Sequence, residues 1–112
     1  MDLDIEVIRA GEVAVVTLPA GKLDAGNTPE LKQAMNPVVD EYTTVILDMS
    51  DLAFVDSSGL GAILSFTRKL AEKKGEIRLC CLQKPVQAIM ELVRLHRVVD
   101  ILNTRQEALK SI

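Results

Sequence analysis

Near the start of the chain, apolar residues recur with the spacing of two β-strands. The two runs cover residues 3–9 and 12–18, with Gly11 between them. Alternation would place Val13, Val15 and Thr17 on one face of the second run, and Ala14, Val16 and Leu18 on the other. Because both faces are almost wholly apolar, this strand is expected to be covered on both sides of its sheet. The run ends at Pro19-Ala20-Gly21, which is typical of a turn.

The next segment has the spacing of an amphipathic helix. It begins at Thr28-Pro29-Glu30, which offers a hydroxyl N-cap, a proline at the first position and an acid in the first turn. Apolar side chains then follow at Leu31, Ala34, Met35, Val38 and Val39. Pro37 removes one backbone hydrogen bond, so we expect the helix to be kinked or its regular part shortened there.

The remaining chain alternates between strand and helix patterns. The strands are expected at Thr44 to Met49, Glu76 to Leu82 and Val98 to Leu102. A helix with Leu60, Ile63 and Leu64 inside follows the first of these and stops at Gly75. Pro85 opens a third helix, whose inner face would carry Val86, Ile89, Met90 and Val93. A capping box at Thr104-Arg105-Gln106-Glu107 starts a terminal helix.

The order of these elements predicts an α/β fold. Strands that alternate with helices favour a mostly parallel sheet with right-handed crossovers. The two N-terminal strands, joined at Gly11, would add an antiparallel pair, and about four helices would cover the sheet. The length of 112 residues indicates one domain over residues 1–112.

Composition narrows the classes of function. A net charge of −3 argues against nucleic acid as the main partner, and an aromatic content of 3% provides no base-stacking platform. No apolar run has the length of a membrane span. The acidic N-terminus does not have the layout of a signal peptide, so we expect a cytoplasmic protein.

The two cysteines, Cys80 and Cys81, are neighbours in the chain. Neighbours on a strand point to opposite faces, so one thiol is expected in the core and the other less buried. This spacing suits neither a structural disulfide nor a metal framework, and we interpret both as ordinary thiols.

The glycine-rich stretch from Phe54 to Gly61 is the strongest candidate site. It follows a strand, opens a helix, and puts Ser57 and Ser58 beside Asp56 at the helix N-terminus. Free N–H groups and the positive end of the helix dipole favour an anion such as phosphate there. Two interpretations remain open from the residues alone: plain capping by Asp56 or a serine, and a modifiable regulatory serine.

Parts for catalysis are scarce. A serine nucleophile needs a base, and the only histidine, His96, is interpreted as a residue near the C-terminal end of the third helix. The serines do not form a nucleophile elbow, and no phosphate-binding glycine loop is present. A weaker alternative is a phosphoacceptor site in which aspartates bind a divalent metal. The aspartates near strand ends are Asp24, Asp48, Asp51 and Asp56. We expect no enzyme, no cofactor and no metal.

The chain resembles a bacterial anti-sigma factor antagonist, a single STAS domain. Four elements carry the resemblance in order along nearly the whole chain: the Gly21-Lys22-Leu23-Asp24 turn, the Val45–Asp48 strand, the Asp51–Gly61 motif and the break at Gly75. The resemblance implies a STAS-type fold and a protein that binds an anti-sigma factor serine kinase and so frees a sigma factor.

The resemblance also assigns roles to residues. It implies that the kinase phosphorylates Ser57, that a PP2C-type phosphatase removes the phosphate, and that Asp24 lies beside this site. The expected partner-binding residues are Asp24, Asp56, Ser57, Ser58, Gly59 and Gly61. Lys22 departs from the family pattern, in which an acidic residue is common at that place, and this bears on partner choice.

One further alternative shares this fold. The chain could be a scaffold or accessory STAS domain that binds regulatory or transport proteins without a phosphorylation cycle. Phosphorylation by a cognate serine kinase separates the two functions.

Overall fold

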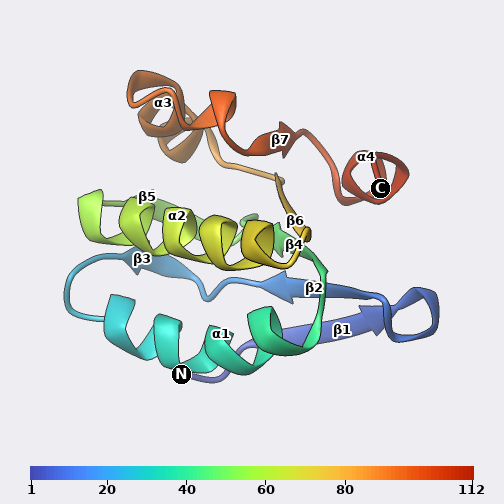
Figure 1. The fold of residues 1–112 in the computed structure, drawn as a ribbon. Coiled ribbons are helices and arrows are strands. Elements are labelled where there is room, and N and C mark those ends of the chain that lie inside the picture. Colours follow the sequence, from blue (N-terminus) through green and yellow to red (C-terminus); the bar gives the residue numbers. More distant parts are fainter.

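A five-stranded sheet organises the chain in the computed structural model, which describes residues 1–112 (Figure 1). Its strand order is β1-β2-β4-β6-β7. The strands are β1 (Asp4–Ile8), β2 (Val13–Thr17), β4 (Thr44–Asp48), β6 (Glu76–Cys80) and β7 (Asp100–Leu102). β1 is antiparallel to β2, and every other neighbouring pair is parallel. The predicted mixed sheet with its antiparallel N-terminal pair is confirmed.

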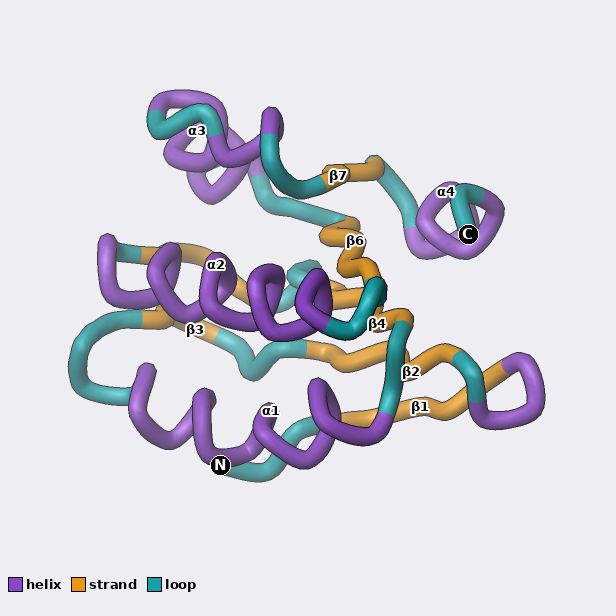
Figure 2. Tube along the Cα trace, in the orientation of Figure 1, coloured by secondary structure: helices purple, strands orange, loops and turns teal.

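Helices cover both faces of this sheet, unequally. α1 (Thr28–Glu41), α2 (Ser57–Glu72) and α3 (Lys84–Leu92) contribute to one large core, whereas α4 (Arg105–Lys110) packs on the other face (Figure 2). Along β2, Ala14 and Val16 belong to the large core, while Val13 and Val15 belong to the smaller one beneath α4. The apolar alternation therefore predicted both faces correctly. None of the helices is long and apolar enough to cross a membrane.

A second, two-stranded sheet extends the carboxyl ends of the central strands. β3 (Gly21–Leu23) and β5 (Leu52–Val55) pair in parallel there. The sequence predicted a turn at Gly21–Asp24 and no strand over Leu52–Val55, and both predictions were wrong. Both strands are short, and β3 begins at Gly21 with a φ of +98°, so the local pattern resembles a turn. Only the pairing of two segments that are distant in sequence makes them strands.

The predicted helix starts and stops need correction at α1 and α2. Asn27, not Thr28, occupies the N-cap of α1, and the Thr28 hydroxyl donates instead to the Asp24 carbonyl at 2.5 Å. α1 continues through Pro37 to Glu41, so the helix is not shortened there. Pro37 and Gln33 are both exposed, so water can solvate the Gln33 carbonyl that the proline leaves without its helical donor.

At the end of α2, Lys74 takes the left-handed conformation that was expected of Gly75. Lys74 has a φ of +61°, and the amides of Lys74 and Gly75 donate to the carbonyls of Ala71 and Leu70. Gly75 is required for a different reason, because a Cβ there would collide with the Thr43 carbonyl oxygen at the start of β4.

The third helix ends earlier than its apolar pattern predicts. Val86 and Met90 are buried as expected, but Val93 is 52% exposed, because α3 ends at Leu92 and Arg94 takes a φ of +60°. The chain then makes a short 3-10 turn, η2 (Leu95–Arg97). His96 lies in that turn and is exposed, so it follows the end of the third helix closely, as expected, but is not part of the helix.

Arg105, the first residue of α4, joins this helix to the sheet. Arg105 donates to Asp48 Oδ2 from Nη2 at 2.9 Å and from Nε at 3.1 Å, and it also reaches Glu6 and Thr17. Burial alone would raise the pKa of Asp48, but hydrogen bonds from Ser50 and the Arg105 guanidinium outweigh it and lower that pKa. The predicted capping box is present in part: the Thr104 hydroxyl accepts from the Glu107 amide, whereas the Glu107 carboxylate accepts from the Asn103 amide.

We predict that Arg105→Ala lowers the free energy of unfolding at pH 7 by about 1–3 kcal/mol, because it leaves the buried Asp48 carboxylate without its partner. The folded pKa of Asp48 is depressed, so this contribution is present above the unfolded pKa of about 3.9 and is lost as pH falls through the folded value. Urea unfolding of both proteins should therefore show a difference that shrinks in acid. Arg97→Ala, at an exposed arginine without an ion pair, is the control. A difference that does not change with pH would contradict this account.

Candidate functional site

The start of α2 and the loop between β3 and α1 form one continuous surface. The Asp56 amide donates to the Leu23 carbonyl at 3.0 Å, which continues the pairing of β5 with β3. The Asp56 side chain then reaches the loop, where its Oδ2 accepts from the Ala25 amide at 3.3 Å. The Gly21–Asp24 segment and the Asp56–Gly61 part of the Asp51–Gly61 motif, which belong to the resemblance, thus lie side by side.

Asp56 is the cap of α2. Its Oδ1 accepts from the amides of Ser58 at 2.8 Å and Gly59 at 3.1 Å, so neither serine caps the helix. Since the Leu60 amide donates to the Asp56 carbonyl, the helix start has few amides left for another anion. The expectation that these N–H groups would receive a phosphate is therefore wrong for Ser58 and Gly59.

Asp24 is held in the adjoining loop as a carboxylate. The hydrogen bond from the Gly26 amide, at 2.9 Å, is the main cause that lowers its pKa, and Lys22 lowers it further. Lys22 Nζ lies 3.3 Å from Asp24 Oδ2. Lys22, the residue that departs from the family pattern, thus partly neutralises the aspartate beside the site.

Asn27 and Thr28 hold the loop in place, and the sequence reasoning did not assign them this role. The Asn27 amide group donates to the Lys22 carbonyl at 2.7 Å and accepts from the Asp24 amide at 2.9 Å. The amide and hydroxyl of Thr28 both donate to the Asp24 carbonyl. The run of small turn-forming residues from Asp24 to Thr28 is the signal that could have revealed this.

The two serines of the motif differ in environment. Ser57 is exposed, whereas Ser58 is half-buried and lines a groove between α1 and α2. The groove has a volume of about 450 Å³. Four residues of α2 form one wall: Ser58, Gly61, Ser65 and Arg68. The opposite wall is formed by Thr28, Pro29 and Lys32 of α1 and by Ala25 of the preceding loop.

The two glycines of the motif also differ. Gly59 is buried, and a Cβ at this position would lie 2.5 Å from Val55 Cγ2 and 3.0 Å from Leu23. Gly59 therefore lets α2 pack against β5 and β3, and a direct partner contact is not needed to explain it. Gly61 is half-buried, and a Cβ there would meet nothing within 4 Å.

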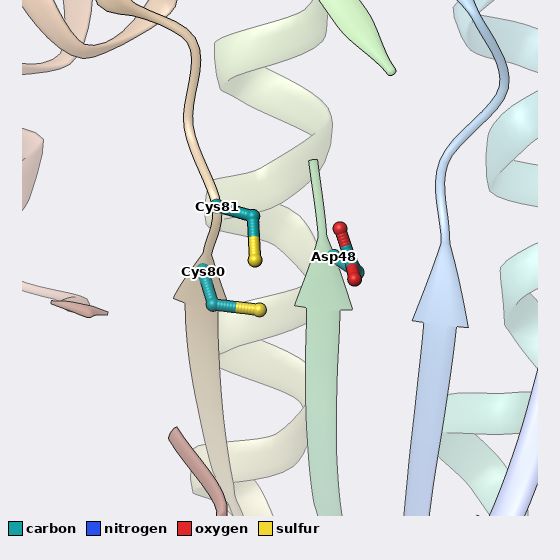
Figure 3. A group of neighbouring side chains, drawn as sticks. All are labelled: Asp48, Cys80 and Cys81. Carbon is teal, nitrogen blue, oxygen red and sulfur yellow. The ribbon is translucent and has the colours of Figure 1, made fainter. Parts of the chain in front are cut away.

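The four candidate aspartates do not form one cluster. Asp48 lies instead with Cys80 and Cys81, whose Sγ atoms and the carboxylate are within 4.8 Å of one another (Figure 3). Burial is the main cause that raises the pKa of Cys80, and its neighbour Cys81 adds to it. The Cys80 thiol is therefore protonated and Asp48 is engaged by Arg105, so a cation would have to displace that ion pair. The prediction that one cysteine is buried and the other less so is confirmed.

His96 offers no base to the serines. It lies in η2, where it lines a separate hollow with Gln87, Glu91, Ile101 and Asn103. The site at Ser57 thus contains carboxylates, hydroxyls and a lysine, and no group placed to activate a serine nucleophile.

Comparison with known proteins identifies the family of this chain. Residues 4–108 match the STAS domain. The chain belongs to the STAS domain family. A curated relative, the anti-sigma F factor antagonist of Paenibacillus polymyxa, is 29% identical over 111 residues, which cover 97% of this chain and 94% of the relative.

Solved structures share the fold of this STAS domain. The anti-sigma factor antagonist SpoIIAA in its unphosphorylated form has a TM-score of 0.80 at 24% identity, with 98% of this chain and 95% of that chain covered. The Bacillus cell fate determinant SpoIIAA in its phosphorylated form has a TM-score of 0.72 at 23% identity, with 98% of each chain covered. The fold recurs in the larger transport protein SLC26A9, with a TM-score of 0.75 at 15% identity, over 87% of this chain and 19% of that chain. The predicted kinship with anti-sigma factor antagonists and the predicted STAS-type fold are confirmed.

We predict that the two motif glycines respond oppositely to alanine. Gly59→Ala should lower the free energy of unfolding by about 1–3 kcal/mol, because its methyl group overlaps Val55 and Leu23. Gly61→Ala should leave it unchanged or raise it by up to about 1 kcal/mol, because alanine suits a helix interior better than glycine. Thermal unfolding followed by circular dichroism compares the two variants, and equal destabilisation by both would refute the distinction.

Proposed function

We propose that this STAS domain is an anti-sigma factor antagonist whose binding is switched by phosphorylation of Ser57. The observation that carries the proposal is an exposed serine placed directly after the Asp56 cap, on the surface that the cap shares with the Asp24 loop. In its unphosphorylated form the domain binds an anti-sigma factor serine kinase, and a sigma factor is freed. The names of its relatives support the partner class.

The geometry supports Ser57 over Ser58 as the acceptor. A kinase must reach the hydroxyl from outside, and Ser57 is exposed whereas Ser58 turns into the groove. Ser57 is the first residue of α2 and is not part of either core cluster. A phosphate there can be added without opening the fold.

Phosphorylation would change binding by adding negative charge at the N-terminal end of α2, beside Asp56 and Asp24. A phosphate adds about −1.5 to −2 charges at neutral pH. Since Asp56 already accepts the amides of Ser58 and Gly59, these cannot also hold the phosphate, which adds instead to the negative charge of Asp56 and Asp24. Acidic groups of a docked partner would be repelled, and the close approach would be blocked. A PP2C-type phosphatase then restores binding.

The partner surface on this proposal comprises Asp24, Asp56, Ser57, Ser58 and Gly61. Gly59, also expected there, supports the surface from below through its close packing on Val55 and Leu23. The proposed activity needs neither a metal nor a cofactor from this chain, and it takes place in the cytoplasm, where the kinase and sigma factor act.

A second candidate function uses the same fold without phosphorylation. The fold also forms a small part of SLC26A9. This recurrence supports a second function, in which the domain is a scaffold that binds regulatory or transport proteins. The two functions differ in one measurable step, the transfer of phosphate to a serine.

Incubation with the cognate serine kinase and ATP should add one phosphate, located on Ser57 by fragment mass spectra. Ser57→Ala should abolish the incorporation, and Ser58→Ala, the neighbouring hydroxyl, should retain it. Phosphate on Ser58 alone would overturn the assignment, whereas binding of the kinase without any incorporation would favour the scaffold function.

Ser57→Asp should weaken binding of the kinase by roughly tenfold or more while leaving thermal stability nearly unchanged, because the added charge lies on the partner surface and outside the core. Ser57→Asn, of the same size and without charge, is the control. Calorimetric titration and thermal unfolding are measured on the same samples. A parallel loss of binding and stability would mean that the switch acts by unfolding the domain.

A further inference from the structure

We propose that the groove between α1 and α2 receives an acidic segment of the anti-sigma factor that docks at Ser57, with Lys32 and Arg68 as its charge partners. The inference rests on the proposed function and adds where along this chain the partner is recognised, and by what chemistry.

The groove continues directly from the site. Ser58 lies at its near end, beside Ser57 and the Asp56 cap, and Ala25, whose amide donates to Asp56, lies opposite. On α2 the wall follows positions 58, 61, 65 and 68, which share one helix face. At about 1.5 Å per residue, this wall is about 15 Å long. A partner segment that reaches Ser57 can therefore continue into the groove without leaving the surface.

Nothing inside the domain explains why Gly61 is a glycine. It lies in the interior of α2, where glycine costs roughly 1 kcal/mol relative to alanine, and a Cβ would meet nothing within 4 Å. Gly59, two residues earlier, shows the contrast, because Val55 and Leu23 crowd its Cα. The space over Gly61 is thus open to an outside group.

The far end of the groove is positively charged, in a chain whose net charge is −3. Lys32 and Arg68 line it from opposite walls, both are exposed, and neither forms an ion pair within the chain. None of the residues that line the groove is acidic. Charge complementarity therefore favours Asp or Glu side chains as the occupants of this end.

The two ends of the surface carry opposite charge. Asp24 and Asp56 lie beside the end of the groove that is next to Ser57, and Lys32 and Arg68 line the groove farther from Ser57. Two cations on separate helices, in a groove of this length, suit an extended segment better than one small anion. Because only the end at Lys32 and Arg68 attracts acidic side chains, such a segment can lie in one direction only, with its acidic part at that end, and this selects among similar partners.

The test is the double variant Lys32→Glu with Arg68→Glu, titrated against each anti-sigma factor serine kinase encoded in the same genome. We expect binding to weaken roughly tenfold or more and the salt dependence of the association rate to fall. Gly61→Leu, which fills the groove without changing charge, should weaken binding as well, while Gly61→Ala should not. Circular dichroism checks that every variant is folded.

The matched control is Arg97→Glu with Lys110→Glu, two exposed cations outside the groove that give the same change in net charge. Equal weakening by both double variants would overturn the inference, since net charge alone would explain it. Parental affinity in the groove variants would also overturn it and leave the proposed function standing. Failure of the parent protein to bind any of the kinases would refute the proposed function itself.

Discussion

The need to cover both faces of β2 and β4 arranges the rest of this molecule. Both strands are buried along almost their whole length, so each face of the sheet must be covered by helices. Three helices supply the larger cover, and the short α4 supplies the smaller. Because α4 has few apolar side chains to bury, the bond between Arg105 and Asp48 holds it at the carboxyl end of β4.

A second interaction, made by the Asp56 carboxylate, joins the start of α2 to the loop between β3 and α1. The Asp56 carboxylate closes the first turn of α2 with one oxygen and receives the Ala25 amide of the neighbouring loop with the other. Capping and site assembly are therefore one interaction. The two interpretations of the motif, a plain cap and a regulatory serine, do not compete: Asp56 performs the first, which leaves Ser57 free for the second.

The surface at Ser57 and the α1–α2 groove carries separate negative and positive regions, which the net charge of the chain does not reveal. The chain is acidic overall, and two carboxylates, Asp24 and Asp56, lie at the start of α2. The only charged residues that line the α1–α2 groove are the cations Lys32 and Arg68. A phosphate at Ser57 would steepen this contrast. The fold can hold such a surface without strain, because the residues concerned lie on helix faces and in a loop outside both cores.

The sequence by itself determined the order of the four helices and of the five strands of the main sheet, the two faces of β2, the antiparallel N-terminal pair and the motif at Asp56–Gly61. These follow from local periodicity and capping chemistry. The tertiary structure decided what depends on segments far apart in the chain. Gly21–Leu23 and Leu52–Val55 became strands only by pairing with each other. Gly59 and Gly75 must be glycines because a Cβ at either position would overlap atoms of a neighbouring element. A Cβ at Gly61 would meet nothing within 4 Å. Lys32 and Arg68 lie on different helices, so no sequence spacing could bring them to one groove; only the packing of α1 against α2 does.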